Sequence, residues 1–335
     1  MLKRLLLMLP IVIGVTAAGH APQATAQELT KVRVGLVRLP SNSPLYIGLD
    51  KGFFRDEGLD LQLTFFDAAS AVPVAVVSGD VDISVGGLTA AFYNLAAKGG
   101  LKIISSTVRE KAGYHLDAFL ITTKAYDEGF RSWKDLTGKR VAITTAGSTY
   151  HLKFVTLAKK NGVDISRVTF VPLQSLQHQA AAFAGNQVDA ASLPALVAEN
   201  FVKTGQGRLM GWAGDETPSQ NGVIAVSPAT IEKRRMLIEK FLRAYDRSVA
   251  LYYDNFLGNG SQSAVSPAQQ QEMLETIARY VHSTVENLKG AMPYYDRRPE
   301  VDVEDMGRQL TVWQELGMAP KSTNIKALVD LSFTR

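Results

Sequence analysis

Small and hydroxyl-bearing residues stand where expected strands end and expected helices begin. Gly147-Ser148-Thr149 precedes a helical pattern over 150–160, and Gly87-Leu88-Thr89 precedes another over 90–98. Glycine permits a close approach to the backbone, and serine or threonine adds a hydroxyl at a helix start. The free N–H groups and the positive dipole end there favour an anion. Two such helix starts facing each other across a cleft could bind a carboxylate, sulfonate or nitrate without a buried lysine.

Other candidate ligand-binding residues also follow expected strands. The loop after the first expected strand contributes Ser41, Asn42, Ser43 and Leu45. Ser192 follows a later strand, and Tyr150 could cover an organic group. Arg109 could hold an anion by two parallel hydrogen bonds, although a solvated surface arginine explains it equally well. Ordinary loop and capping residues would explain each site singly, so the matched pair of helix starts is what favours binding.

Metal ligation and catalysis are not indicated by any motif. His115, His151 and His178 have no partner at metal-ligand spacing. Neither H-E-x-x-H nor G-x-S-x-G occurs. The chain has no cysteine, which excludes disulfides, thiol catalysis and cysteine-ligated metals. We therefore expect no cofactor, no metal and no enzymatic activity.

The elements that position the candidate residues occur twice along the chain. An expected strand at 32–37 has a counterpart at 139–144, and each is followed by a second strand, a helix and a third strand. The two helices end at equivalent glycines, Gly79 and Gly185, which suit a helix C-terminus. Two copies of one plan predict two α/β lobes with mostly parallel sheets.

Two apolar extended segments, 116–123 and 222–226, could carry the chain to the second lobe and back, and the lobes would open and close about them. Ser227-Pro228 then begins a mainly helical region, because serine is a favoured N-cap and proline fits the first helical position. The expected boundaries are a signal peptide over 1–26, a discontinuous first lobe over 27–118 and 226–335, and a second lobe over 119–225.

The N-terminus has the pattern of an export signal. Lys3 and Arg4 precede an apolar run of 11 residues, Leu5–Val15. A membrane-spanning helix needs roughly 20 apolar residues, so an anchor is the weaker interpretation. Ala24-Thr25-Ala26 fits a cleavage site, which would make Gln27 the first mature residue. We therefore expect a protein exported to a bacterial periplasm.

Composition is that of an ordinary soluble protein of about two domains. The 335 residues are 46% hydrophobic and 20% charged, with a formal net charge of +4. Two of those positive charges lie in the expected signal peptide. The nearly neutral remainder does not favour nucleic-acid binding.

Four motifs together resemble the periplasmic substrate-binding proteins of ABC transporters, nitrate/sulfonate/taurine class. They are Pro44–Phe54 with the following Glu57-Gly58-Leu59, Gly79–Ile83, Trp133–Ala142 and Gly185–Ala190. The resemblance covers most of residues 30–255. It implies a type II periplasmic binding fold, in which two lobes joined by two crossover strands close on a ligand and deliver it to a membrane permease.

The ligand is less defined by the resemblance. Ser192–Leu196 departs from the sulfonate-type pattern, in which an acidic residue and an aromatic are common near a proline. Sulfonates including taurine, nitrate, aromatic carboxylates and thiamine-precursor pyrimidines are all compatible with the family. No convincing buried acid is evident in the proposed loops, so we expect a small anion. Nothing in the sequence suggests an obligate oligomer, and a monomer suits delivery to a permease.

Two alternatives remain at this point. One is a biosynthetic enzyme of the same fold. The thiamine-pyrimidine type carries a cysteine-rich motif that this chain lacks, and the signal peptide argues against the cytosolic menaquinone type. The other is a receptor that serves a membrane sensor instead of a permease.

Overall fold

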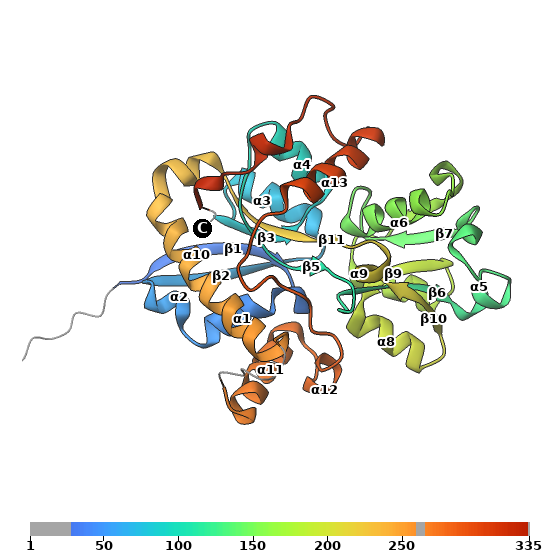
Figure 1. Ribbon diagram of the computed structural model, residues 1–335, viewed down its shortest axis with the longest axis horizontal. Helices are drawn as coiled ribbons and strands as arrows, with labels where there is room; N and C mark the ends of the chain where they lie inside the picture. Colours follow the sequence, from blue (N-terminus) through green and yellow to red (C-terminus); the bar gives the residue numbers. More distant parts are fainter. Residues whose placement is uncertain (1–27, 259–264, 334–335) are drawn as a thin grey trace, which may run out of the picture.

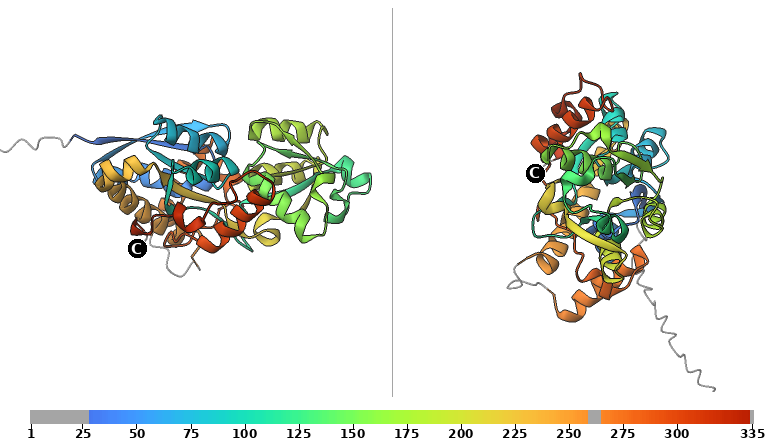
Figure 2. Two further views of the ribbon diagram at one scale, coloured as in Figure 1. Left: turned by 90° about the horizontal axis from the view of Figure 1, so that it is seen from above. Right: turned by 90° about the vertical axis from the view of Figure 1, so that its right-hand side faces the viewer.

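Two β-sheets lie side by side in the computed structural model of the protein, and helices cover both faces of each (Figure 1). The structure describes residues 28–258 and 265–333, so the expected signal peptide over 1–26 lies outside the described residues. The view from above shows two neighbouring halves along the long axis (Figure 2, left). Within the described ranges, no helix has the length and apolar character needed to cross a membrane.

The first sheet has the strand order β2-β1-β3-β12-β4. Strand β1 is parallel to both of its neighbours, whereas β12 runs antiparallel to β3 and β4. This sheet and the helices packed on it are called the first lobe. Its strands are β1 (Thr30–Val37), β2 (Leu59–Phe66), β3 (Ile83–Gly87), β4 (Lys102–Ser106) and β12 (Gly222–Val226).

The second sheet repeats the plan of the first, with the order β8-β7-β9-β6-β10. Strand β7 is parallel to β8 and β9, and β6 is the antiparallel strand in the fourth position. The predicted fold of two mostly parallel α/β lobes is therefore confirmed. The strands of this second lobe are β6 (Asp117–Thr122), β7 (Arg140–Ile143), β8 (Thr169–Pro172), β9 (Ala190–Pro194) and β10 (Gly207–Trp212).

The connection between the lobes is shorter and more polar than the sequence pattern suggested. The apolar segments 116–123 and 222–226 are mainly β6 and β12, which lie inside the two sheets. The crossing itself is made by β5 (Arg109–Glu110) and β11 (Ser219–Gln220), which pair with each other antiparallel. Apolar runs mark buried strands, and two-residue polar strands leave no such pattern.

Helices pack on the sheets of both lobes. Those of the first lobe are α1 (Ser43–Asp50), α2 (Phe53–Asp56), α3 (Val72–Ser78), α4 (Ala90–Ala97), α10 (Pro228–Phe256), α11 (Pro267–Val281), α12 (Val285–Leu288) and α13 (Val303–Glu315). Those of the second lobe are α5 (Thr123–Asp127), α6 (Thr149–Lys160), α7 (Leu176–Ala184), α8 (Ala195–Lys203) and α9 (Ala213–Glu216). The C-terminal helices α10–α13 pack on the first sheet, so both ends of the described chain belong to one lobe.

Local capping signals fix the helix starts that the sequence indicated. Thr89 Oγ1 accepts a hydrogen bond from the Phe92 N–H, and Ser148 Oγ accepts one from the His151 N–H. Ser227 caps α10 in the same way. Gly79 adopts a φ of +82°, a left-handed conformation that glycine takes without strain. Caps depend on neighbours in sequence, which is why they can be predicted without the fold.

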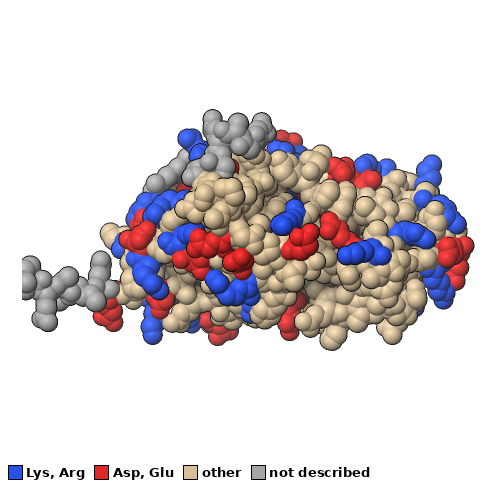
Figure 3. All heavy atoms as spheres, turned by 90° about the horizontal axis from the view of Figure 1, so that it is seen from below, with Lys and Arg blue, Asp and Glu red and all other residues tan. Residues whose placement is uncertain are grey.

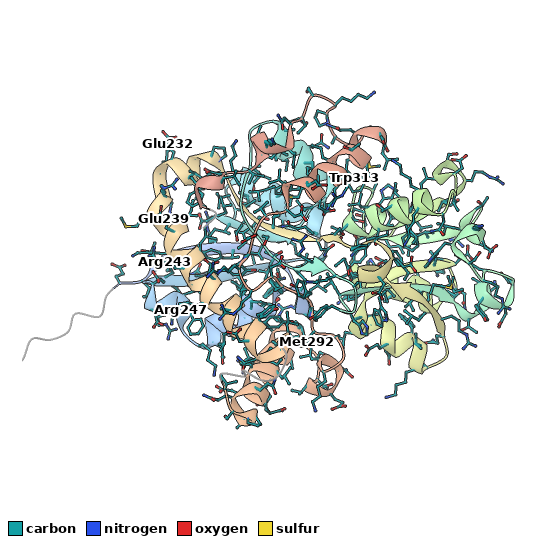
Figure 4. All side chains as sticks on the ribbon, viewed as in Figure 1. Glu232, Glu239, Arg243, Arg247, Met292 and Trp313 are labelled. Atoms are coloured by element: carbon teal, nitrogen blue, oxygen red, sulfur yellow. The ribbon has the colours of Figure 1, made fainter. Side chains whose placement is uncertain are left out.

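The long helix α10 is held to the first lobe by both packing and ion pairs. Phe241 and Tyr245 are buried against the sheet. On its outer side, Arg243 and Arg247 (Figure 4) pair with Glu57 and Asp56 of the α2 region at 2.8 and 3.2 Å. Exposed ion pairs of this kind contribute little stability each, so the packing of apolar side chains contributes most to holding α10 on the first lobe. Both signs of charge are interspersed over the face shown in Figure 3.

A close helix contact gives a test of this packing. A Cβ on Gly48 of α1 would lie 1.9 Å from Ser248 Oγ of α10. Gly48→Ala should therefore lower the free energy of unfolding by about 1–3 kcal/mol, because the two helices must separate. Urea unfolding measures it. Gly86→Ala, whose Cβ would meet its nearest atom at 3.7 Å, is the control. Equal destabilisation by both variants would contradict this account of the contact.

Candidate ligand-binding site

A cleft lies between the lobes, where the carboxyl ends of the central parallel strands of both sheets meet. Its space is about 850 Å³, including the part open to solvent. The first lobe contributes the loop after β1 with Ser41 and Asn42, and the end of β3 with Gly87. The second lobe contributes the start of α6 with Ser148, Thr149 and Tyr150. This is where open α/β sheets bind ligands.

Six of the candidate residues line this cleft together, and seven do not. Those on its wall are Ser41, Asn42, Gly87, Ser148, Thr149 and Tyr150. Ser43, Leu45, Leu88, Thr89 and Gly147 are close to these residues in sequence but are not on the wall. Their contact with a ligand stays a prediction. Ser43 Oγ donates to the Pro40 carbonyl, so its hydroxyl serves the loop itself.

Arg109 and Ser192 lie away from the cleft wall. The Arg109 guanidinium pairs with Asp296 and Asp302, at 3.2 and 2.6 Å, in a hollow beside the crossover strands. Both acids come from a segment almost 200 residues later, so no local pattern could reveal them. Ser192 is fully buried inside β9, and its carbonyl accepts a hydrogen bond from Gln179 Nε2 at 2.6 Å.

Three nearly buried side chains on the cleft wall carry hydroxyls that make no hydrogen bond to any described residue. Thr107, Thr144 and Tyr150 are 3%, 4% and 7% exposed. Among the described residues, none forms a hydrogen bond with these three hydroxyl oxygens. Burial raises the pKa of Tyr150 far above its usual range, so its hydroxyl stays protonated. Because buried polar groups are nearly always paired, these hydroxyls are suited to an occupant of the cleft.

The lobes touch directly at the cleft, so the structure is a closed form. The Ala90 N–H of α4 donates to the Gly147 carbonyl of the second lobe at 2.8 Å. A Cβ on Gly147 would lie 2.7 Å from Ala90 Cβ, and a Cβ on Gly87 would lie 2.9 Å from Thr149 Cγ2. Glycine at these two positions therefore permits this close contact between the lobes.

His151 supports this contact from behind. Burial lowers the pKa of His151 to about 4, so its ring is neutral near pH 7. Its Nδ1 accepts the Gly147 N–H at 3.1 Å, which fixes the loop before α6. The ring also lies 5.7 Å from that of Trp313 in α13, a helix of the first lobe (Figure 4). The histidine thus has a structural role beside the cleft.

Comparison with known proteins identifies the family. The family model described as "NMT1/THI5 like" matches residues 40–255. The chain belongs to the NMT1/THI5-like family. No curated protein sequence matches it.

Solved structures share the fold of this NMT1/THI5-like protein. The alkanesulfonate-binding protein SsuA from Xanthomonas axonopodis pv. citri, bound to MOPS, is 17% identical with a TM-score of 0.73, covering 90% of this chain and 99% of its own. The periplasmic nitrate-binding protein NrtA from Synechocystis PCC 6803 is 14% identical with a TM-score of 0.69, covering 92% and 88%. A mutant of DSZB in complex with biphenyl-2-sulfinic acid is 14% identical with a TM-score of 0.59, covering 91% and 97%. At these identities the likeness shows the fold.

Sequence reasoning missed several cleft residues of this NMT1/THI5-like protein. Ala291 and Pro293 come from the segment between α12 and α13, where Met292 is labelled in Figure 4. Their types carry no chemical signal, and only the fold brings them to the cleft. Asp117 was missed because it begins an apolar strand, although an acid at the edge of such a run is a signal that could have been used.

Asp117 is part of a buried charge cluster that joins the crossover to α6. Lys153 Nζ of α6 pairs with Glu110 Oε1 at 2.8 Å and also binds Asp117 Oδ2. All three side chains are buried. Burial raises the pKa of Glu110 to about 8, the nearby Asp117 adds to the rise, and Lys153 opposes it. At neutral pH Glu110 is therefore mainly protonated, and one lysine faces one carboxylate.

The C-terminal segment ties the crossover strands in place. The Gln220 N–H of β11 donates to Asp305 Oδ2, and its side-chain Oε1 accepts the Asp302 N–H, both at 2.8 Å. Gln309 Nε2 donates to the Gln220 carbonyl at 2.8 Å. Together with the Arg109 pairs, these bonds connect β5 and β11 to the start of α13. No group of three or more acidic or histidine side chains in the described part of the chain could hold a metal ion.

The raised pKa of Glu110 predicts a pH dependence of stability. Below pH 4.5 the carboxyl is protonated in both folded and unfolded chains, and its contribution is fully present. That contribution is lost as pH rises toward 8, because the unfolded chain releases the proton and the folded chain does not. The urea midpoint should therefore fall between pH 5 and 8 and then level off.

Glu110→Gln should flatten this decline, since its amide does not titrate. Glu304→Gln removes an exposed carboxylate of α13 and is the matched control, expected to keep the wild-type slope. An unchanged slope in Glu110→Gln would show that another group titrates in this range.

Proposed function

We propose that this protein is a periplasmic solute-binding receptor that closes two lobes on a small organic ligand and delivers it to the permease of an ABC importer. The observation that carries the proposal is a set of cleft-wall hydroxyls, from both lobes, to which no described residue forms a hydrogen bond. Thr107 comes from the first lobe, and Thr144 and Tyr150 come from the second. A ligand that binds both sets contacts both lobes and thereby favours the closed state.

The cleft wall supports a ligand with an apolar body. Its larger aliphatic side chains are Val37, Leu39, Val85, Val108, Leu116, Leu176 and Leu196. An organic group would displace water from this surface, whereas a bare nitrate ion would leave it hydrated. We therefore place an organic solute ahead of an inorganic anion.

Helix starts supply a place for an electronegative group. The first residues of α6 (Thr149 and Tyr150) and of α8 (Ala195 and Leu196) line the cleft. First-turn N–H groups lack partners within their own helix and carry partial positive charge. Ala195 is an exception, because its N–H donates to the Leu116 carbonyl. A carboxylate, sulfonate or carbonyl oxygen suits the other first-turn N–H groups. These N–H groups are the part of the expected anion site that the proposal keeps.

The partner and the location are supported by family and sequence. Structures of the same fold include proteins described as alkanesulfonate-binding and as periplasmic nitrate-binding. The N-terminal export pattern and cleavage site agree with a periplasmic protein. A monomer suits transfer of a ligand to a permease, and no nucleic acid is involved.

Thermal unfolding with a panel of solutes tests the receptor function. Sulfonates, carboxylates, nitrate and pyrimidines are added to the purified protein at fixed ionic strength. A true ligand at about 1,000 times its Kd should stabilise the folded protein by roughly 4 kcal/mol, seen as a clear rise in Tm. Stabilisation by organic members, with no rise for nitrate, is expected. A flat response to the whole panel would contradict the receptor function for these solutes.

The closing contact provides a second prediction. Gly87→Ala should weaken binding of the most stabilising panel compound at least about fivefold, because the new Cβ would press on Thr149 Cγ2 only when the lobes close. Calorimetry measures the affinity. Adding Thr149→Ser removes that methyl group and should restore most of the loss. Gly185→Ala, at an exposed position away from the cleft wall, is the control and should bind normally. Failure of the double variant to recover would mean that Gly87 acts in some other way.

A further inference from the structure

Asp117 gives the cleft an acid where the sequence loops showed none. It lies on the cleft wall and is 4% exposed. The expectation of a simple anion depended on the absence of such a residue, so the structure removes that reason. A second acid, Asp67, lies at the exposed edge of the same wall.

No positive side chain lines the cleft wall beside these acids, among the residues that the structure describes. None of the described residues lining the cleft is a lysine, arginine or histidine. Lys153 is paired with Glu110 and Asp117, and Arg109 is paired with Asp296 and Asp302 outside the cleft. A simple anion would therefore meet acceptor oxygens with only helix N–H groups and neutral hydroxyls to hold it.

The Asp117 carboxylate keeps room for another donor. A carboxylate offers about four acceptor positions. Among the described residues, Lys153 is the only one whose N–H donates to it, at Oδ2. Glu110 belongs to the same cluster, and its carboxyl O–H can donate to at most one further acceptor position of Asp117. Acceptor positions therefore remain on this carboxylate, which lies on the cleft wall.

Resting on the proposed function, we infer that the ligand is a nitrogen-bearing organic solute whose N–H group donates to Asp117 while its electronegative group lies at the start of α6. The class includes amines, amides and aminated rings, with or without an acidic group on the same molecule. Solutes that offer only acceptors, such as nitrate, alkanesulfonates and simple carboxylates, are outside it. Thr107, Thr144 and Tyr150 suit either end, since a hydroxyl can both donate and accept.

Matched pairs of probes test this inference on the wild-type protein. The pairs are 2-aminoethanesulfonate and ethanesulfonate, 4-aminobenzoate and benzoate, and 4-aminopyrimidine and pyrimidine. Within the pair that fits the cleft, the amino compound should bind at least about tenfold more tightly in calorimetry, as expected for a hydrogen bond to a charged group. Equal or tighter binding of the amine-free member would overturn the inference and leave the receptor function standing. No binding by any probe would contradict both.

A substitution connects the difference to one residue. Asp117→Asn should reduce the affinity for the amino compound about tenfold or more and leave its amine-free partner unchanged, so the preference within the pair disappears. Asp127→Asn, at an exposed position of the second lobe, is the matched control and should keep the preference. A preference retained in a folded Asp117→Asn protein would overturn the assignment to Asp117. Should the variant not fold, the comparison of the paired probes on the wild-type protein decides by itself.

Discussion

The buried contact of Lys153 with Glu110 and Asp117 is the constraint on which the geometry of the cleft depends. Glu110 ends the outgoing crossover strand, Asp117 begins the first strand of the second sheet, and Lys153 belongs to α6. The contact therefore fixes the orientation of the second lobe relative to the crossover strand β5. Burying charges costs several kcal/mol per ion, and retention of a proton by Glu110 reduces that cost to one ion pair. Because Lys153 lies near the start of α6, the same contact also positions that helix start, which forms one wall of the cleft.

Small residues from both lobes meet beside the cleft in this protein. The Ala90 N–H and the Gly147 carbonyl meet across the lobes, and glycine at 87 leaves space for Thr149. Thr107, Thr144 and Tyr150 line the cleft beside this contact. A wall of small residues lets the lobes approach, and in the proposed receptor a polar solute that pairs with these hydroxyls would favour the closed form.

Much of the fold could be predicted because its signals are local or repeated. Caps such as Ser148 and Thr89 act on the next turn of chain, and the recurring strand–helix–strand plan identified both sheets. The site was predicted only where it lies in loops after strands. Arg109 could not be placed, because its partners Asp296 and Asp302 are distant in sequence. Ala291 and Pro293 could not be predicted either, because only the fold brings this C-terminal segment to the cleft. Asp117 lies at the edge of an apolar strand, and the strand pattern did not single it out.

Helix α13 has a mechanical consequence for the motion of the lobes. It is bonded to the crossover through Asp302, Asp305 and Gln309, and its far end reaches the second lobe, where Glu315 pairs with Lys159 at 3.1 Å. The helix therefore spans both lobes, with its start bonded to the crossover and its end beside α6. If the lobes of the proposed receptor open, that end must separate from α6, so amino-acid changes along α13 would alter the balance of open and closed forms without touching a ligand. The residues that contact a ligand and the residues that set the balance of open and closed forms can thus change separately in evolution.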